Sequence, residues 1–375
     1  AEEKTEFTVV LKDGGANTKL VGTAITDQLD HGIDLTRQVL LQPTFPADEF
    51  AKLKTQTINE LAVHQENPIT VAGEELSQAI FDDTPLGRHE SPSSVSAVTL
   101  GDVKNYYHAI YKPNDAILMI AGDIDLGQGR ALAKKLLDGW QSGELPKVDY
   151  TLPAYQKRVI LVDDPAPKQS VLFFGERAYD IHNDDKFAGM LAGQILSAGI
   201  DSRLMEYVRA EKGYVYGVGA YFSPGREAGS FGGETQTGFE TTADTITAIY
   251  KVFTDVRTAP VTPKELADNK NRVAGAMLMQ TQTIQQQADR RVDAILNGYP
   301  IDYWDKLPAR VSQVSAEQVQ DLMNKYVKDN EMSIVVVAPA DRVEKQLEQF
   351  GKVQVLPMPS KRSATTQPSG NEMLK

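Results

Sequence analysis

Hydrophobic and polar positions follow two different periods along the chain, and together these periods predict an α+β protein. Short, continuously apolar runs at 117–121, 158–162 and 333–337 predict buried strands. Longer stretches with apolar residues three and four positions apart predict helices, among them 47–66 and 262–297. Strands that are reached through helices of this length predict sheets with helices packed on one face.

The same order of elements occurs twice at a constant spacing. Glu49 and Glu265 lie near the starts of two long predicted helices and are 216 positions apart. Val103 and Val319 are also 216 positions apart, and each lies in a helix that begins after a Thr or Ser cap. The strands that follow these helices keep the same spacing. We therefore predict two copies of one α+β unit.

The repeat also predicts how the chain is divided. The first unit covers 1–150, the second covers 151–356, and a polar segment without periodicity, 357–375, is predicted to be a disordered tail. If the second copy begins at the strand 158–162, the matching start of the first copy would lie about 60 residues before Ala1. We therefore expect a first unit that is incomplete at its N-terminus, either because the chain is a fragment or because the unit is naturally short.

Composition and charge exclude several classes of protein. The chain has 375 residues and a formal net charge of −12, which argues against nucleic acid and anionic membranes as partners because both attract Lys and Arg clusters. It has no cysteine, which excludes disulfides, thiol catalysis and cysteine-bound zinc. No apolar run approaches the length of a membrane span.

The usual catalytic and metal-binding motifs are absent from the sequence. No two of the five histidines have the spacing of a zinc-binding His-x-x-x-His helix. Glu60 and His64 share one face of a predicted helix, but zinc needs at least three protein ligands, so a solvated helix face explains the pair more simply. The glycine-rich stretch 213–219 lacks the strand-to-helix order of a dinucleotide-binding loop. Periodicity alone therefore predicts a duplicated α+β protein, and it does not indicate a catalytic activity or a metal site.

One segment, 199–219, is more specific. It reads Gly-Ile-Asp-Ser-Arg-Leu-Met-Glu-Tyr-Val-Arg-Ala-Glu-Lys-Gly-Tyr-Val-Tyr-Gly-Val-Gly, a predicted helix followed by a strand. It resembles the motif in the C-terminal domain of pitrilysin-type (M16) metallopeptidases and their mitochondrial processing peptidase relatives. Arg209 and Tyr216 have the seven-residue spacing of that family's substrate-binding Arg/Tyr pair. Without the resemblance, Arg209 would be a surface residue paired with Glu206, and Tyr216 an ordinary strand aromatic.

The resemblance implies a fold and a set of roles. M16 proteins consist of duplicated α+β units, each with an antiparallel-rich sheet and helices on one face. Their first unit binds catalytic zinc through His-x-x-Glu-His and a later Glu, and that later Glu falls on Glu60 here. The His-x-x-Glu-His motif itself would lie before Ala1. The resemblance therefore implies the half or subunit that binds substrate through Arg209 and Tyr216, without a complete zinc site and without tightly bound zinc of its own.

Three functions remain open at this point. The chain is a fragment or partner subunit of an M16-type zinc peptidase that positions unfolded peptide, or a catalytically inactive assembly component, or a peptide-binding module that uses an exposed strand edge. The expected partners are unfolded peptide or protein, together with an M16 chain bearing His-x-x-Glu-His or a second copy of this chain. The absence of cysteine and the acidic composition favour the periplasm over the cytosol.

Overall fold

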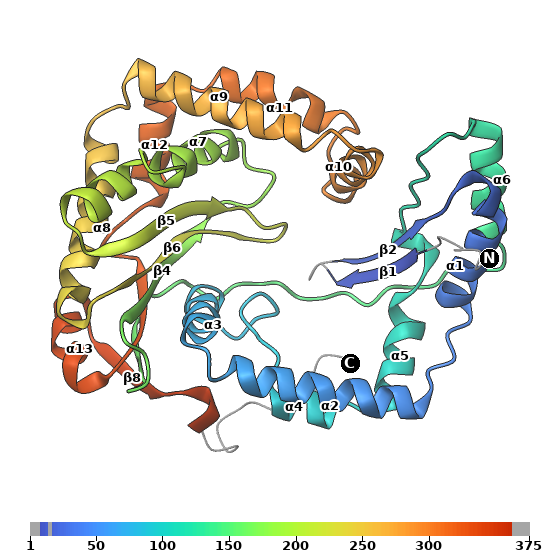
Figure 1. The fold of residues 1–375 in the computed structure, drawn as a ribbon, viewed down its shortest axis with the longest axis horizontal. Coiled ribbons are helices and arrows are strands. Elements are labelled where there is room, and N and C mark those ends of the chain that lie inside the picture. The colour runs from blue at the N-terminus through green and yellow to red at the C-terminus, as the bar shows by residue number, and fades with distance from the viewer. Residues whose placement is uncertain (1–7, 14–16, 362–375) are drawn as a thin grey trace, which may run out of the picture.

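We analysed a computed structural model, which describes residues 8–13 and 17–361. Figure 1 shows an α+β arrangement in which one six-stranded sheet lies at the left, while most helices of the first 140 residues lie at the bottom and right. The strands are β1 Thr8–Asp13, β2 Thr18–Thr23, β3 Val159–Asp163, β4 Ser170–Ala178, β5 Val215–Ser223, β6 Gly229–Thr237, β7 Ser333–Ala338 and β8 Val353–Pro357.

Helices connect and cover these strands. The α-helices are α1 Leu29–Leu41, α2 Ala47–His64, α3 Pro68–Phe81, α4 Pro92–Ala97, α5 Leu100–Ile110, α6 Leu126–Leu137, α7 Lys186–Ser197, α8 Thr242–Thr258, α9 Pro263–Met279, α10 Ile284–Leu296, α11 Tyr303–Ser312, α12 Ala316–Tyr326 and α13 Ala340–Leu347. A π-helix, η3, covers Met205–Glu211. Short 3-10 turns cover Thr26–Gln28, Pro113–Asp115, Phe239–Thr241, Glu348–Phe350 and Pro359–Lys361.

The six-stranded sheet is mixed and has the order β5-β6-β4-β7-β3-β8. Antiparallel pairing joins β5 to β6, β6 to β4 and β4 to β7, whereas β3 pairs in parallel with both β7 and β8. The antiparallel half therefore carries β5 at its edge, and the parallel half carries β8. The prediction of an antiparallel-rich sheet is correct for three of the five pairings.

The two faces of the sheet bury different side chains. Leu172, Phe174 and Ile334 point to one face and pack with α7, α8 and α12 in the larger core. Strand β7 is buried on both faces, because its Val335 and Val337 point to the opposite side. At about 25 cal/mol per Å² of apolar surface, a strand so enclosed is among the most strongly stabilised parts of the fold.

Helix α3 covers that opposite face, so the prediction of helices on one face only is wrong. Val71, Leu76 and Ile80 of α3 pack on Val335 and Val337, together with other apolar residues of β3 and β4, in a second core. The reason is visible in the sequence of β7, whose uninterrupted apolar run leaves neither face suited to water. A helix from the first 140 residues thus completes the sheet of the second part.

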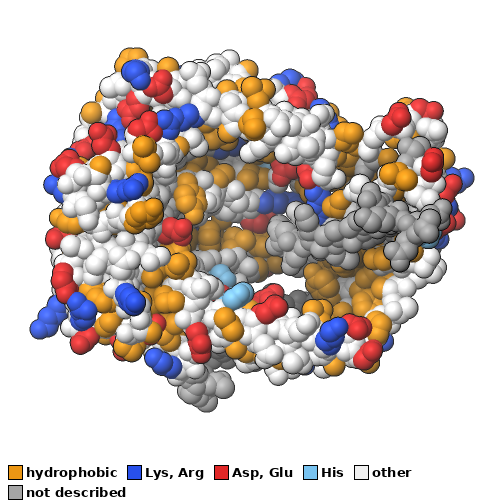
Figure 2. Space-filling view, viewed as in Figure 1, with side chains coloured by type: hydrophobic (Ala, Val, Ile, Leu, Met, Phe, Trp, Pro, Cys, Tyr) orange, Lys and Arg blue, Asp and Glu red, His pale blue; other side chains and the backbone are white. Residues whose placement is uncertain are grey.

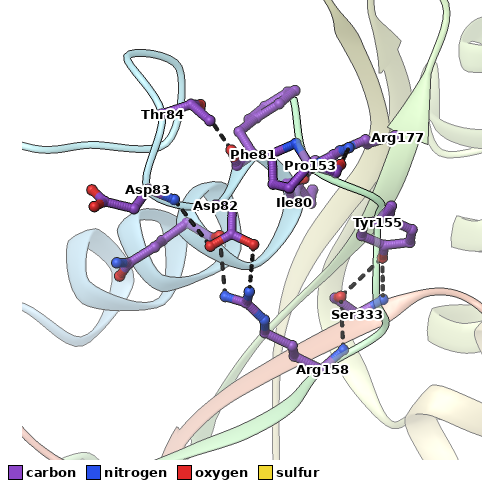
Figure 3. A network of polar contacts seen from close by, with 11 residues as sticks. Ile80, Phe81, Asp82, Asp83, Thr84, Pro153, Tyr155, Arg158, Arg177 and Ser333 are labelled. Carbon is purple, nitrogen blue, oxygen red and sulfur yellow. Dashed lines mark hydrogen bonds and ion pairs between the residues drawn. The ribbon is translucent and has the colours of Figure 1, made fainter. Parts of the chain in front are cut away.

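Polar contacts fasten the C-terminal end of α3 to the sheet and to the linker that precedes β3 (Figure 3). Arg158 donates to the Asp82 carboxylate at 2.8 Å, and Arg177 donates to the carbonyl of Ile80 at 2.6 Å. On the linker, the Tyr155 hydroxyl lies 2.9 Å from the Ser333 hydroxyl. The two guanidinium groups face the negative end of the α3 dipole, where cations are favourable.

The first part has no second sheet of this kind within the described residues. Its β1 and β2 form a separate antiparallel pair, and the strand predicted at 117–121 does not form. Helices α2 and α9, like α5 and α12, begin 216 positions apart, yet the predicted pair of equivalent sheet-bearing units is not evident. A strand needs a neighbouring strand to satisfy its backbone, and among the described residues 117–121 pairs with none of the strands in either sheet.

The C-terminal boundary also differs from the predicted tail at 357–375. Pro357 ends strand β8, and Met358 is buried in the second core, so the folded part extends to at least residue 361. The remainder of the predicted tail, 362–375, lies outside the described residues. None of the helices that the structure describes combines the length and apolar character needed to cross a membrane.

Candidate functional site

The segment that carries Arg209 is anchored firmly to the larger core. Leu204, directly before the π-helix, and Val208, within it, are both completely buried. Next to them, the Arg203 guanidinium makes two 2.8 Å hydrogen bonds to the Glu265 carboxylate of α9. A bidentate pair of this kind fixes direction as well as distance. The position of Arg209 is therefore set by packing on one side and by α9 on the other.

A sharp turn brings the chain from this π-helix into β5. Gly213 has φ of +68°, a conformation that glycine adopts without steric cost. The pairing of β5 with β6 then contains an irregularity between Val215 and Val218, so Tyr216 lies in a β-bulge. Bulges commonly redirect a side chain beside a functional site, and π-helical turns occur at such sites as well.

Two threonines of β6 hold the bulge from behind. Thr237 donates to the carbonyl of Tyr214 at 2.9 Å, and Thr235 donates to the carbonyl of Gly217 at 2.6 Å. Both hydroxyls belong to buried residues. Our sequence analysis missed these positioning residues, although the alternating Thr-x-Thr of β6 shows that both point to the same face.

The structure brings the predicted pair together. The guanidinium carbon of Arg209 lies 5.0 Å from the centre of the Tyr216 ring, a cation–π contact. Tyr216 is 88% exposed, so its hydroxyl is open to a ligand. Arg209 therefore contacts Tyr216 rather than forming the surface pair with Glu206. Guanidinium and phenol together present several hydrogen-bond donors and could hold a peptide carbonyl or a carboxylate.

Helix α7 occupies the edge of β5 beside this pair. The Ser197 hydroxyl donates to the carbonyl of Ala220 at 2.8 Å and accepts from its N–H at 2.6 Å. Gly193 and Gly189, one and two turns earlier, also face β5: a Cβ at Gly193 would lie 3.6 Å from the Cβ of Tyr221, and one at Gly189 would lie 3.3 Å from the Phe222 ring. A peptide therefore cannot add a continuous strand to this edge of the sheet, because the backbone groups of Ala220 are already bonded.

The predicted metal ligand lies apart from the Arg/Tyr pair. Glu60 is exposed near the C-terminal end of α2, one turn before His64, which is also exposed. Within residues 8–13 and 17–361, no group of three potential ligands gathers in a metal-binding arrangement. Glu60 alone does not fit the demands of zinc, which takes at least three protein ligands. Glu60 is therefore not assigned a role in zinc chemistry.

Comparison with known proteins identifies the relationship. Residues 97–273 match the family model described as the peptidase M16 inactive domain. This segment of the chain therefore resembles an M16 inactive domain. This agrees with the resemblance found in the Arg209–Tyr216 segment. A relative from Helicobacter pylori, named "Non-peptidase homolog YmxG", is 22% identical over 82% of this chain and 72% of its own length.

Solved structures show the same fold. An M16 inactive domain from Pseudomonas fluorescens superimposes with a TM-score of 0.81, at 24% identity, covering 90% of this chain and 82% of that one. The periplasmic protease PqqL from Escherichia coli superimposes with a TM-score of 0.75, at 17% identity, covering 90% of this chain and 38% of that one. These likenesses establish the α+β fold of an M16 domain.

Proposed function

We propose that this chain is the non-zinc-binding part of an M16-type peptidase, a fragment or partner subunit that binds unfolded peptide and positions it for cleavage. One observation carries the proposal, namely the contact between Arg209 and the exposed ring of Tyr216 on two firmly anchored elements. A scaffold without a ligand has no need of an exposed aromatic that is presented by a bulge and stacked under a cation.

The pair is suited to a backbone carbonyl. Arg209 and Tyr216 both present donors, and a peptide bond offers one carbonyl acceptor to each residue of an extended chain. Because the donors sit on a π-helix and a braced bulge, little conformational entropy is lost when they bind. The same donors would stabilise negative charge that develops on a carbonyl oxygen during cleavage by a partner chain.

Figure 2 is consistent with an enclosed path for such a peptide. The face shown has a hollow at its centre, bordered by many hydrophobic side chains. Strand β2 and helix α10 are joined by an ion pair between Lys19 and Asp289. Unfolded chains expose both apolar side chains and unpaired backbone groups, so a hollow of this character suits them better than a folded protein.

The test measures peptide binding and peptide turnover separately. The chain is titrated against a fluorescein-labelled unstructured peptide, and fluorescence anisotropy measures the affinity. Replacement of Arg209 by Ala, or of Tyr216 by Phe, is expected to weaken binding by about five- to tenfold per lost hydrogen bond. The far-ultraviolet circular dichroism and Tm of both variants should match those of the wild type. Unchanged affinity in both correctly folded variants would refute the role of the pair.

Turnover requires the residues that this chain does not supply. We expect no peptidase activity from the chain alone, and activity once an M16 chain with His-x-x-Glu-His is added. In that mixture, loss of one carbonyl donor is expected to lower kcat/KM by roughly a hundredfold. Zinc would be held by the added chain. Chelator-sensitive activity in the purified chain alone would contradict this assignment.

A catalytically inactive assembly component is the second candidate, and the name of the Helicobacter pylori relative favours it. Such a component would bind its M16 partner without needing Arg209 or Tyr216. Equal affinity for the partner and no affinity for peptide would select this function. The periplasm is the proposed compartment, on the strength of the cysteine-free sequence and the periplasmic fold relative.

A further inference from the structure

Part of the sheet face that α3 covers is left open. Helix α3 packs over β3, β7 and β4, but no residue of β5 or β6 belongs to the second core. The register places Gly219 opposite Glu234, and Tyr221 opposite Gly232, all on this same face. The open face therefore begins beside Phe173 of β4 and extends to the edge at β5. It leads directly to Tyr216.

Two glycines on β5 have no structural requirement that the fold explains. A Cβ at Gly217 would meet no atom within 4 Å, and one at Gly219 would meet the Ser197 side chain at ordinary distances, 3.8 Å from its hydroxyl and 3.9 Å from its Cβ. Neither residue has positive φ. By contrast, Gly232 must be small because the carbonyl of Phe174 lies 2.6 Å from where its Cβ would be. Strand glycines without such a need often mark the close approach of a ligand or another backbone.

A carboxylate and an aromatic ring stand at the far end of this bare stretch. Glu234 is exposed, and among the ion pairs of the described residues none includes it. Tyr221 is 51% exposed and shares its face on the neighbouring strand. Burial and the charge of Glu234 both raise the pKa of Tyr221, which indicates that the two side chains are close. An unpaired carboxylate beside an aromatic face suits an ammonium or guanidinium group.

We propose that the open face of β5 and β6 selects basic peptides, with a Lys or Arg side chain bound by Glu234 and Tyr221 while Arg209 and Tyr216 hold a backbone carbonyl. The inference rests on the proposed function and adds the substrate class. The peptide passes over Gly217 and Gly219, where bare backbone leaves room for it.

The spacing and the edge of the sheet define the path. Tyr216 and Tyr221 are five residues apart on β5, roughly 15 Å at strand rise, so four to five residues of extended peptide separate the carbonyl from the basic side chain. The path lies over the face, because Ser197 closes the edge at Ala220. The net charge of −12 also attracts cationic peptides to the protein as a whole. The variants described below distinguish this general attraction from the specific attraction to Glu234.

The first experiment compares two labelled peptides that differ only in one central residue, Lys or Gln. The wild-type chain is expected to bind the Lys peptide about fivefold more tightly at low salt. Glu234→Gln should remove the preference for the Lys peptide. Glu234→Lys should instead bind a third peptide, with Glu at the same central position, more tightly than the Lys peptide. Glu344→Gln, an equal change of charge on α13, is the control and should keep the wild-type preference.

The second experiment tests the path. Gly219→Ala is compatible with the backbone and should leave the Tm at or above the wild-type value, yet it should weaken the binding of both peptides at least fivefold because the Cβ occupies the bare stretch. Wild-type affinity in Gly219→Ala would overturn the path. Equal binding of the Lys and Gln peptides by the wild type, with both weakened by Arg209→Ala, would overturn the selectivity and leave the proposed function standing. Failure of the wild type to bind either peptide would overturn both.

Discussion

Glu176 of β4 is a buried acid whose replacement should change how the stability of the protein depends on pH. Its side chain is 4% exposed, and its Oε1 accepts a 2.8 Å hydrogen bond from the N–H of Lys328. Burial is the main cause that raises its pKa from 4.5 to about 8, with Glu331 and Asp329 adding to the rise. That backbone hydrogen bond and the charge of Lys328 act in the opposite direction without cancelling it.

The sign and size of the effect follow from this difference in pKa. Below pH 4.5 the Glu176 carboxyl is protonated in both the folded and the unfolded chain, so its burial does not lower the free energy of unfolding through ionisation. Between pH 4.5 and about 8 the unfolded chain releases the proton while the folded chain retains it, so the free energy of unfolding falls with rising pH. At ~1.4 kcal/mol per pH unit, the whole loss is at most about 5 kcal/mol.

Glu176→Gln should remove this loss. Glutamine is nearly isosteric, stays neutral and can still accept the hydrogen bond from Lys328. We expect the variant to match the wild type at pH 4.5 and to exceed its free energy of unfolding by several kcal/mol at pH 8. Urea unfolding at pH 4.5, 6, 7 and 8 measures the difference, and the exposed Glu344→Gln is the matched control. Parallel pH curves for wild type and Glu176→Gln would show that burial of the charge is not decisive.

Three further changes test the packing around the sheet. Leu76→Ala in α3 should lower the free energy of unfolding by about 2–5 kcal/mol. The control is Leu53→Ala in α2: Leu53 is 63% exposed, so its replacement should change the free energy of unfolding by less than about 0.5 kcal/mol. Equal losses in the two variants would refute the packing of α3 on the sheet. Arg158→Ala should cost about 1 kcal/mol, and a double-mutant cycle with Asp82→Ala should return a coupling of similar size, since both side chains are partly exposed. Ser197→Ala should lower the free energy of unfolding by about 1–3 kcal/mol, because it leaves the N–H and the carbonyl of Ala220 without their partner. Amide hydrogen exchange at the β5 edge should become faster, and an unchanged exchange rate would contradict the closure of this edge by Ser197.

The strands of the second part were predictable because their patterns are local. Strands β3 and β7 lie within one residue of the apolar runs at 158–162 and 333–337 that predicted them. The long predicted helix 262–297 is instead two helices, and the signal for the break was available. Thr283 and Gln286 form a capping box at the start of α10, a spacing that a sequence can reveal. Helix α11 was missed since it contains Pro308, which reads as a helix breaker.

The site was predictable only as a pair of residue types at a spacing. Arg209 and Tyr216 are seven positions apart, and only the resemblance of this spacing to the M16 motif suggested a shared role; the contact itself depends on a π-helix and a bulge that bring them together. The pattern of a single strand does not reveal the position of a bulge, because the extra residue is defined only against the partner strand. The placement of α3 across the sheet depends on tertiary packing in the same way.

The shared core beneath α3 makes the protein one cooperative body despite its extended middle. A protease that cuts the linker between α6 and β3 would break the chain without freeing either piece, because α3 on one piece remains buried against β4 and β7 on the other. The nicked protein should therefore migrate as a single species under native conditions and separate only in denaturant. By the same reasoning, residues 151–361 expressed without α3 would expose the apolar side chains of Val171, Val335 and Val337 and should aggregate.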